Sequence, residues 1–421
     1  MLNLILSLAS ALPGSQGGTL TLEEAIRIAE QNAFSVKVAQ TNVEKTRQRI
    51  SEVRGSQGPK LSAGSTYTRV ETTGSSFPTP KDQSQAQLTL SMPVDITGII
   101  GKGIRASEVA LKSAGALVDA KRNDLRQQVR TAYFRVLQAE ALVGVSEEAL
   151  KNAEERLAVT KKEFEAETKA RIDVLRIETQ VRQNEADLLA AQNAVRLAKQ
   201  SLNNTMSRPI ETPIEPVDIV DLPKVASSPE ELISGAIQRR PDVLAQDFNI
   251  QSLALVRSAQ EGGLYPSLQL SANHGRAFGQ PSFGGGRSTT TGTIGLSIPI
   301  FDSGVTRARV KQARQDEEAA KILLDQLKLG VSLEVRQALS NLQDAWSRYE
   351  VAQKAVVLAA ETYRITKIRY QETDAIQLEV VDAQTELTRA QSQLVTTKYD
   401  YLTAYAALQR AVAADNPGGM N

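Results

Sequence analysis

The stretch Val129–Phe164, VRTAYFRVLQAEALVGVSEEALKNAEERLAVTKKEF, decides how this chain folds. Large apolar residues recur in it at every seventh position and form one row. The row consists of Val129, Val136, Val143, Leu150, Leu157 and Phe164. Small residues form a second row, made of Ala132, Ala139, Ser146 and Ala153. A sustained seven-residue repeat predicts a coiled-coil seam, and the small row allows a neighbouring helix to approach closely.

The helical pattern extends well beyond this stretch. It runs without proline from the region after Gly98 to about Ala166, and a second helical pattern follows with apolar residues at every seventh position from Val174 to Leu202. A helix of the first length would be on the order of 100 Å long, which no globular core needs. The pair predicts a long antiparallel helical hairpin over residues 101–206.

The same order of features recurs 206 to 207 residues later, so the sequence is a tandem duplication. We predict repeat 1 over residues 19–206, with short helices, a β-hairpin over 59–95 and the helical hairpin over 101–206. A proline-containing linker spans 207–228. Repeat 2 covers 229–414, with a β-hairpin over 266–300 and a helical hairpin over 304–414. We interpret residues 1–18 as a weak or clipped export signal or a disordered N-terminus, and 415–421 as a disordered tail.

The strands are predicted from residues that alternate between apolar and polar. Leu88, Leu90, Met92 and Val94 alternate with polar residues or proline, and Ile294, Leu296, Ile298 and Ile300 do the same in the second repeat. Each of these runs ends in a proline that a glycine follows five positions later, at Gly98 and Gly304. The polar loops between the paired runs are typical of long exposed hairpin loops.

Composition excludes several classes of function. The chain has 49 basic and 48 acidic residues, interspersed along the helical tracts, so a nucleic-acid partner is not expected. It has no cysteine and a single histidine, His274, which we interpret as a structural or lumen-facing strand residue. We therefore expect no catalytic residues, no cofactor and no metal site.

No apolar run is long enough for a membrane-spanning helix, so any crossing would have to be made by strands. The four predicted strands of one chain would leave open edges, which lipid does not tolerate. Two copies would give eight strands, with an interior that side chains fill, whereas three copies would give twelve and a water-filled lumen. We expect three.

Three features resemble the TolC-like outer-membrane efflux protein family. They are the order of hairpin and helix pair in each repeat, the segment Arg240-Pro241-Asp242, and the Pro-x-x-x-x-Gly strand exit. The resemblance covers residues 19 to 414. It implies a mainly helical protomer of a trimeric 12-stranded transmembrane β-barrel that continues into a long coiled-coil α-barrel. It implies a location in the outer membrane of a Gram-negative cell, with extension into the periplasm.

The resemblance also implies a function and partners. The chain would be the outer-membrane channel of a tripartite efflux pump or a type I secretion system, a passive duct for small molecules or proteins. Its partners would be two further copies in a homotrimer, outer-membrane lipid, a periplasmic adaptor (membrane fusion) protein, and an inner-membrane pump or ABC exporter. The alternative is a soluble or periplasmic coiled-coil scaffold or adaptor protein.

The family's helix-turn signature is an aromatic residue, a glycine three residues later, and then an acidic-apolar-apolar-acidic-alanine run. Tyr370 and the run Glu379–Ala383 are similar to it, and Phe164 and the run from Asp173 take these places in repeat 1. Glu167 and Thr373 stand where the family has glycine.

Site residues follow from this match. Glu379 and Asp382, with Asp173, resemble the carboxylates at the periplasmic aperture. The turn residues Glu167, Thr168, Thr373 and Asp374 resemble the adaptor-contacting helix tips. Because Glu379 and Asp382 are three positions apart, they share one helical face, and a threefold axis would gather them into an acidic ring that favours cations. Ordinary solvated helix carboxylates are the alternative.

Overall fold

The computed structural model describes residues 19–69, 71, 82–219, 222–225, 228–278, 288–372 and 375–414. The sequence predictions for residues 1–18 and 415–421, and for Thr373 and Asp374, lie outside these ranges. The chain divides into two compact units. One comprises Met1–Val38, Asp119–Arg240 and Leu329–Asn421, and the other Ala39–Val118 and Pro241–Lys328. Each unit therefore takes segments from both repeats.

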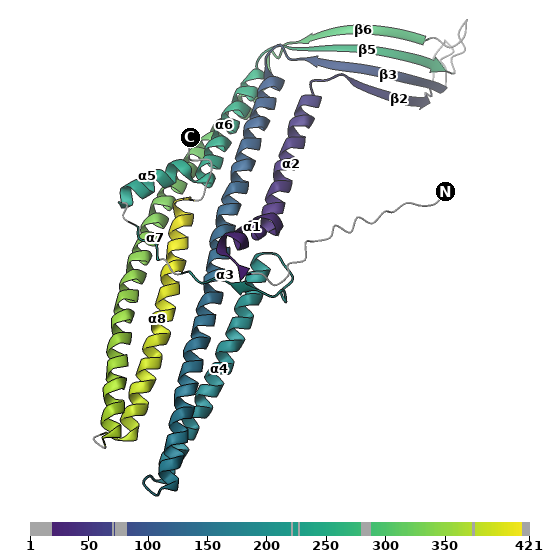
Figure 1. Cartoon of the computed structure of the whole chain (residues 1–421). Helices are drawn as coiled ribbons and strands as arrows, with labels where there is room; N and C mark the ends of the chain where they lie inside the picture. Colours follow the sequence, from purple (N-terminus) through teal and green to yellow (C-terminus); the bar gives the residue numbers. More distant parts are fainter. Residues whose placement is uncertain are drawn as a thin grey trace, which may run out of the picture. The chain divides into compact units, whose positions relative to one another are not determined.

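The helices of the two repeats correspond one to one (Figure 1). In repeat 1 they are α1 (Leu22–Asn32), α2 (Phe34–Gly55), α3 (Ile99–Glu165) and α4 (Arg171–Thr205). In repeat 2 they are α5 (Pro229–Arg239), α6 (Pro241–Gly262), α7 (Val305–Gln371) and α8 (Gln377–Ala411). Corresponding helices have equal lengths of 11, 22, 67 and 35 residues, as a duplicated sequence requires. No helix in the described ranges carries the continuous apolar stretch of a membrane span.

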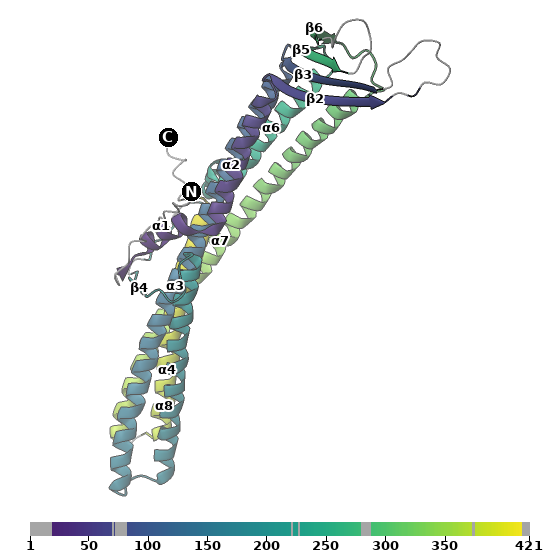
Figure 2. The ribbon, with the colours of Figure 1, turned by 90° about the vertical axis from the view of Figure 1, so that its right-hand side faces the viewer.

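The second unit contains a four-stranded antiparallel sheet in the order β2-β3-β5-β6 (Figure 2). Its strands are β2 (Lys60–Arg69), β3 (Asp82–Val94), β5 (Ser267–Phe278) and β6 (Ser288–Ser297). The register places Leu61 opposite Leu90, Met92 opposite Leu270, and Leu268 opposite Leu296. Directly opposed residues share a face, so one face of the sheet is apolar and the other polar, as the alternating pattern predicted.

The strand exits turn at glycine, as the Pro-x-x-x-x-Gly spacing indicated. Gly98 and Gly304 have φ of 70° and 84°, a left-handed conformation that costs glycine nothing. An aspartate then caps each long helix. Asp95 accepts a hydrogen bond from the amide of Gly101 at 2.7 Å, and Asp302 accepts one from the amide of Thr306 at 2.7 Å.

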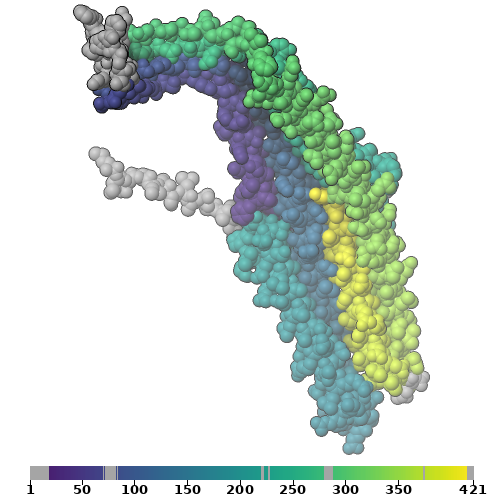
Figure 3. Space-filling view, turned by 180° about the vertical axis from the view of Figure 1, so that it is seen from behind, coloured from purple at the N-terminus to yellow at the C-terminus, as the bar shows by residue number. Residues whose placement is uncertain are grey.

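In the first unit, α4, α3, α8 and α7 lie side by side in that order (Figure 3). Val129, Val136 and Val335, which belong to the predicted seam rows, are fully buried. The small row is buried as well, with Ala153, Ala345 and Ala352 at 4% exposure or less. The apolar row becomes less buried toward the α3–α4 turn: Val143, Leu150 and Leu157 are half-buried, and Phe164 is 41% exposed. The seven-residue pattern therefore predicted the packed core correctly at Val129 and Val136, whereas burial decreases along the rest of the row and is lost at Phe164.

Two very short strands pair with each other in the first unit. β1 (Thr19–Leu20) pairs in parallel with β4 (Glu215–Pro216), and the buried Tyr133 of α3 holds both. Its hydroxyl lies 2.8 Å from the Leu20 carbonyl and 2.9 Å from the Val217 amide, from which it accepts a hydrogen bond. Burial raises the pKa of this phenol, so it remains a neutral donor and acceptor at physiological pH.

The short helices begin at the capping residues that the sequence indicated. At α5 the capping box is complete, since Ser228 accepts from the Glu231 amide and the Glu231 carboxylate accepts from the Ser228 amide, both at 3.3 Å. At α1, Thr21 accepts from the Glu24 amide at 3.3 Å, which is one half of the box.

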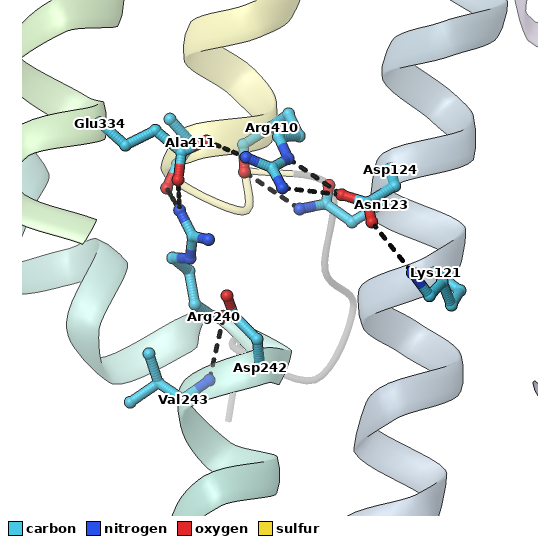
Figure 4. Close-up of polar contacts among 9 residues, drawn as sticks. All are labelled: Lys121, Asn123, Asp124, Arg240, Asp242, Val243, Glu334, Arg410 and Ala411. Atoms are coloured by element: carbon cyan, nitrogen blue, oxygen red, sulfur yellow. Dashed lines mark hydrogen bonds and ion pairs between the residues drawn. The ribbon is translucent and has the colours of Figure 1, made fainter. Parts of the chain in front are cut away.

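A network of charged side chains joins α3, α7 and α8 to Arg240, the residue that follows α5 (Figure 4). This network lies at the opposite end of the helical hairpins from their turns. Arg240, only 5% exposed, pairs with Glu334 at 2.6 Å and donates to the carbonyl of Ala411 at 3.2 Å. Arg410 pairs with the same Glu334 and with Asp124, the latter at 2.9 Å. Two guanidinium groups therefore share one carboxylate, and the segment Arg240-Pro241-Asp242 is tied to the first unit through its arginine.

Candidate functional site at the helical hairpin ends

The turn between α3 and α4 closes with a Schellman motif. The amide of Thr168 donates to the carbonyl of Glu163 at 2.9 Å, and the amide of Glu167 donates to the carbonyl of Phe164 at 3.0 Å. The Thr168 hydroxyl adds a bond to the same Glu163 carbonyl at 2.8 Å. These bonds satisfy carbonyls that the end of a helix leaves without partners.

Glu167 adopts the left-handed conformation that this motif requires, with φ of 57°. It is the position at which the resemblance places a glycine. The structure therefore explains why a glycine suits this place: a side chain there costs about 1 kcal/mol or more of conformational strain. The substitution has left the turn itself intact.

Glu167→Gly is expected to raise the stability of the chain by about 0.5–1 kcal/mol, because it removes strain that exceeds the extra entropy of glycine in the unfolded state. The measurement is the thermal midpoint by circular dichroism. Ser207→Gly, at the corresponding left-handed residue after α4 (φ 54°), should act in the same direction. A lower midpoint for Glu167→Gly would show that its side chain makes a compensating contact.

Of the proposed aperture carboxylates, Glu379 lies in the first turn of α8, Asp382 lies about one turn further along, and Asp173 lies in the first turn of α4. Glu379 and Asp382 are exposed and share one face of α8, whereas Asp173 is half-buried near the start of α4. No hydrogen bond or ion pair joins Asp173 to the other two within the described residues. Carboxylates in a first turn also favour helix formation through the helix dipole, and neither α4 nor α8 has a side-chain N-cap.

Glu379 has a basic neighbour in its own hairpin. Its carboxylate lies 3.7 Å from the guanidinium of Arg369 near the end of α7. Both side chains are about half exposed, at 46% and 51%, so the pair contributes at most about 1 kcal/mol. Asp382 has no such partner in the described part of the chain, and it carries the less compensated charge.

The two hairpins are joined near their turns by tyrosines of α7. The hydroxyl of Tyr370 lies 3.1 Å from the carboxylate of Glu163 on α3, and the ammonium of Lys169 lies 4.9 Å from the centre of the Tyr370 ring. Burial raises the pKa of the Tyr370 phenol, and Lys169 opposes this shift. The phenol therefore keeps its proton at neutral pH and donates it to Glu163.

Two further contacts cross between the hairpins. Arg156 of α3 donates to the hydroxyl of Tyr363 at 3.4 Å, and the buried Gln377 of α8 donates to the hydroxyl of Thr160 at 3.0 Å. These residues line a cavity of about 560 Å³. Nη1 of Arg156 and Oε1 of Gln377 are buried there without a hydrogen-bond partner, so the cavity has an unused donor and an unused acceptor.

The sequence interpretation missed these cross-hairpin contacts. It placed Tyr370 in the helix-turn signature and gave no role to the hydroxyls of Tyr363 and Tyr370. Each bonds to the residue 207 positions earlier, one position before its own equivalent in repeat 1, so corresponding parts of the two repeats contact each other. The offset between the repeats indicates which parts of the two hairpins correspond. It predicts a contact between them only once the order of the helices in space is known.

In the ranges that the structure describes, no group of three or more His, Asp or Glu side chains lies close enough to hold a metal ion. The groups that gather at the hairpin ends are carboxylates, phenols and basic side chains at a surface turn. They can attract or repel charged solutes and can bind a protein surface.

A family model and individual relatives match this chain over nearly its whole length. The outer membrane efflux protein model matches residues 25–207 and 232–414, one segment in each repeat. The probable efflux pump outer membrane protein TtgC of Pseudomonas putida is 23% identical, covering 93% of this chain and 82% of that protein. The outer membrane efflux protein BepC of Brucella suis is 22% identical, with coverage of 97% and 88%.

Solved structures share the fold. The outer-membrane channel OprN superposes with a TM-score of 0.78 at 20% identity, covering 93% of this chain and 89% of that one. The CmeC outer membrane channel of Campylobacter jejuni gives 0.79 at 17% identity, with coverage of 95% and 87%. These proteins are named as channels, and the comparisons do not favour the coiled-coil scaffold. The mainly helical fold, the matched repeats and the relatives agree: this chain belongs to the outer membrane efflux protein family, and it is an efflux channel of the outer membrane that extends into the periplasm.

Proposed function

We propose that the chain works as one of three identical protomers of a passive duct without a catalytic centre. An inner-membrane pump or ABC exporter would load the duct through a periplasmic adaptor protein. The observation that carries this proposal is that one chain exposes apolar edges which only further copies can cover. In sequence terms, the protomer comprises repeat 1 (19–206), a linker (207–228) and repeat 2 (229–414).

The edges of the sheet support assembly. Among the described residues, β2 and β6 each pair on one side only, and their apolar side chains are exposed: Leu61 is 72% exposed and Ile294 is 76%. In lipid, unpaired strand edges are not tolerated. Three copies joined from β6 to β2 would close twelve strands into a barrel, with the apolar face toward lipid and the polar face lining a lumen.

The helices support the same closure. The two inner helices of the first unit, α3 and α8, pack against each other, whereas the outer helices α4 and α7 expose large apolar residues. On α4 these are Ile172, Leu175, Leu189 and Leu197, and on α7 within this unit they are Leu329, Leu333, Val351, Val357, Leu358, Ile365 and Ile368. Such exposed stripes indicate a protein interface. Contact of α7 with α4 of the next copy would be head-to-tail and would close a ring.

The repeat predicts which residues meet across that interface. Glu148 of α3 and Gln391 of α8 form a contact of 3.4 Å within the chain. If α7 packs against α4 of the next copy as α3 packs against α8, then the counterparts of this pair are Lys354 on α7 and Glu185 on α4, each 206 positions away. Both lie on their helices without being buried.

The double variant Glu185→Cys, Lys354→Cys tests the assembly, because the chain has no cysteine of its own. A short bis-maleimide should link it into covalent dimers and trimers on a denaturing gel, and the ladder should stop at three. Each single variant should remain monomeric on the gel. A ladder that stops at two, or no linkage in detergent or in whole cells, would contradict the threefold ring.

The hairpin ends have two proposed roles. Glu379 and Asp382, with Asp173, would line the periplasmic aperture, where symmetry would multiply their charge. The exposed turn residues Glu167 and Thr168 would contact the adaptor, and we extend this proposal to Thr373 and Asp374 of the second turn. The exposure of Glu379 and Asp382 supports the first role, and the position of the α3–α4 turn at the end of a hairpin supports the second.

A further inference from the structure

The apolar face of the sheet changes character at the end that carries the long loops. Along β5 this face presents Leu268, Leu270 and Ala272, and then His274, Arg276 and Phe278. The register places His274 between Leu88 and Thr290, and Arg276 between Ala86 and Ser288. A basic and aromatic group therefore continues the lipid-facing surface where the apolar residues stop. His274 lies on this apolar face, so the lumen-facing orientation considered in the sequence analysis was wrong.

This group lies at the height of a membrane boundary. Ser288, opposite Arg276, and Leu296, opposite Leu268, lie eight positions apart on β6. At about 3.3 Å per residue this is about 26 Å along the strand, or about 20 Å along the membrane normal for a strand tilted by about 40°. All four strands connect to helices at the other end. Since the helices are periplasmic, Arg276 faces the outer leaflet.

Arg276 offers an uncompensated positive charge. Its guanidinium lies 5.3 Å from the centre of the Phe278 ring, and the side chain is exposed. No hydrogen bond or ion pair to a carboxylate is seen for it among the residues that the structure describes. A guanidinium held on an aromatic face keeps its fork of N–H donors available for a planar or tetrahedral anion.

The other arginine of this rim is different. Arg69 on β2 lies 3.8 Å from the carboxylate of Glu71 and opposite Asp82 on β3. The hydroxyl of Tyr67 donates to Asp82 at 2.6 Å. Among the described residues, the arginine on the β2–β3 side of the rim therefore has carboxylates beside it, whereas Arg276 on the β5–β6 side has none.

His274 supplies a second group next to Arg276. Its Nδ1 lies 2.8 Å from the hydroxyl of Thr290 on β6, which orients the ring. When Nδ1 accepts this bond, the proton is on Nε2, which then serves as a donor. Two residues along one strand face are separated by about 7 Å, a distance that one phosphate-bearing headgroup can bridge.

We propose that Arg276, supported by Phe278 and His274, binds the phosphate of a phosphorylated lipid headgroup in the outer leaflet. The charge complementarity, the membrane-boundary height and the adjoining apolar face together fit an amphiphile with an anionic head and acyl chains. The inference rests on the lipid-facing assignment of the apolar face and not on the number of protomers, so the cysteine cross-link can fail without affecting it.

The test is native mass spectrometry of the purified full-length protein in detergent, titrated with bisphosphorylated lipid A and, separately, with its dephosphorylated form. We expect saturable binding of the phosphorylated lipid and at least fivefold weaker binding of the dephosphorylated one. Arg276→Gln should reduce affinity for the phosphorylated lipid at least fivefold and leave the dephosphorylated lipid unchanged. Arg276→Lys, which keeps the charge but loses the planar fork, should bind the phosphorylated lipid with an affinity between those of the parent and of Arg276→Gln.

Two matched variants control for the loss of an arginine. Arg69→Gln removes the ion-paired arginine of the same rim, and Arg309→Gln removes an exposed arginine of α7. Both should bind phosphorylated lipid within twofold of the parent. The proposal is overturned if Arg276→Gln, with an unchanged circular dichroism spectrum, also binds within twofold. It is equally overturned if inorganic phosphate alone binds as tightly as the lipid and depends on the same residue.

Discussion

The double variant Glu379→Ala, Asp382→Ala is expected to lose block by multivalent cations in single-channel recordings. The concentration of hexamminecobalt(III) that halves the current should rise about tenfold or more, because the proposed aperture would lose a ring of closely spaced charges when two carboxylates are removed from every protomer. Asp382→Ala alone should account for most of the change, since Glu379 has Arg369 as a neighbour at 3.7 Å.

The control is Asp344→Ala, Glu350→Ala, which removes two exposed carboxylates from α7 away from the helix starts. It should change the blocking concentration less than twofold. If both double variants behave like the parent, then Glu379 and Asp382 are ordinary solvated carboxylates that favour the start of α8, and the aperture lies elsewhere.

Arg240→Ala is expected to destabilise the chain by about 3 kcal/mol. Removal of one partner of a buried pair costs about 3–5 kcal/mol. The lower end applies here because Glu334 is 34% exposed and keeps Arg410 as a partner. The carbonyl of Ala411 also loses a donor. In a thermal melt followed by circular dichroism, the midpoint should fall by about 5 °C or more.

Arg348→Ala is the matched control, because it breaks an arginine–carboxylate pair of similar length, 2.8 Å to Asp344, whose side chains are 56% and 64% exposed. Exposed pairs contribute less than about 1 kcal/mol, so its midpoint should move by about 2 °C at most. Equal effects of the two substitutions would show that burial does not distinguish the Arg240 pair.

Much of the candidate site could be predicted because it lies on segments with strong local patterns. Asp173 and Glu379 fall in first helical turns, where sequence signals are clear, and the α3–α4 turn forms at Glu167 and Thr168. The sequence could not predict which side chains of the two helical hairpins bond to each other at the site. The bonds of Tyr370 to Glu163 and of Gln377 to Thr160 connect residues more than two hundred positions apart, and no local pattern encodes such pairs.

The sequence by itself determined the secondary structure of this protein, its duplication and the inward or outward face of each element. It could do so because seven-residue and two-residue periods are local patterns. Burial of the apolar stripe that they form stabilises a helix or strand whichever element packs against it. The tertiary structure alone decided which edges meet: β3 with β5 across the repeats, and α3 with α8. It also decided that Arg240 shares Glu334 with Arg410, and that Arg69 has a carboxylate beside it whereas Arg276 has none among the residues that the structure describes. Charge pairing is set by distance in space, and only the folded chain defines that distance.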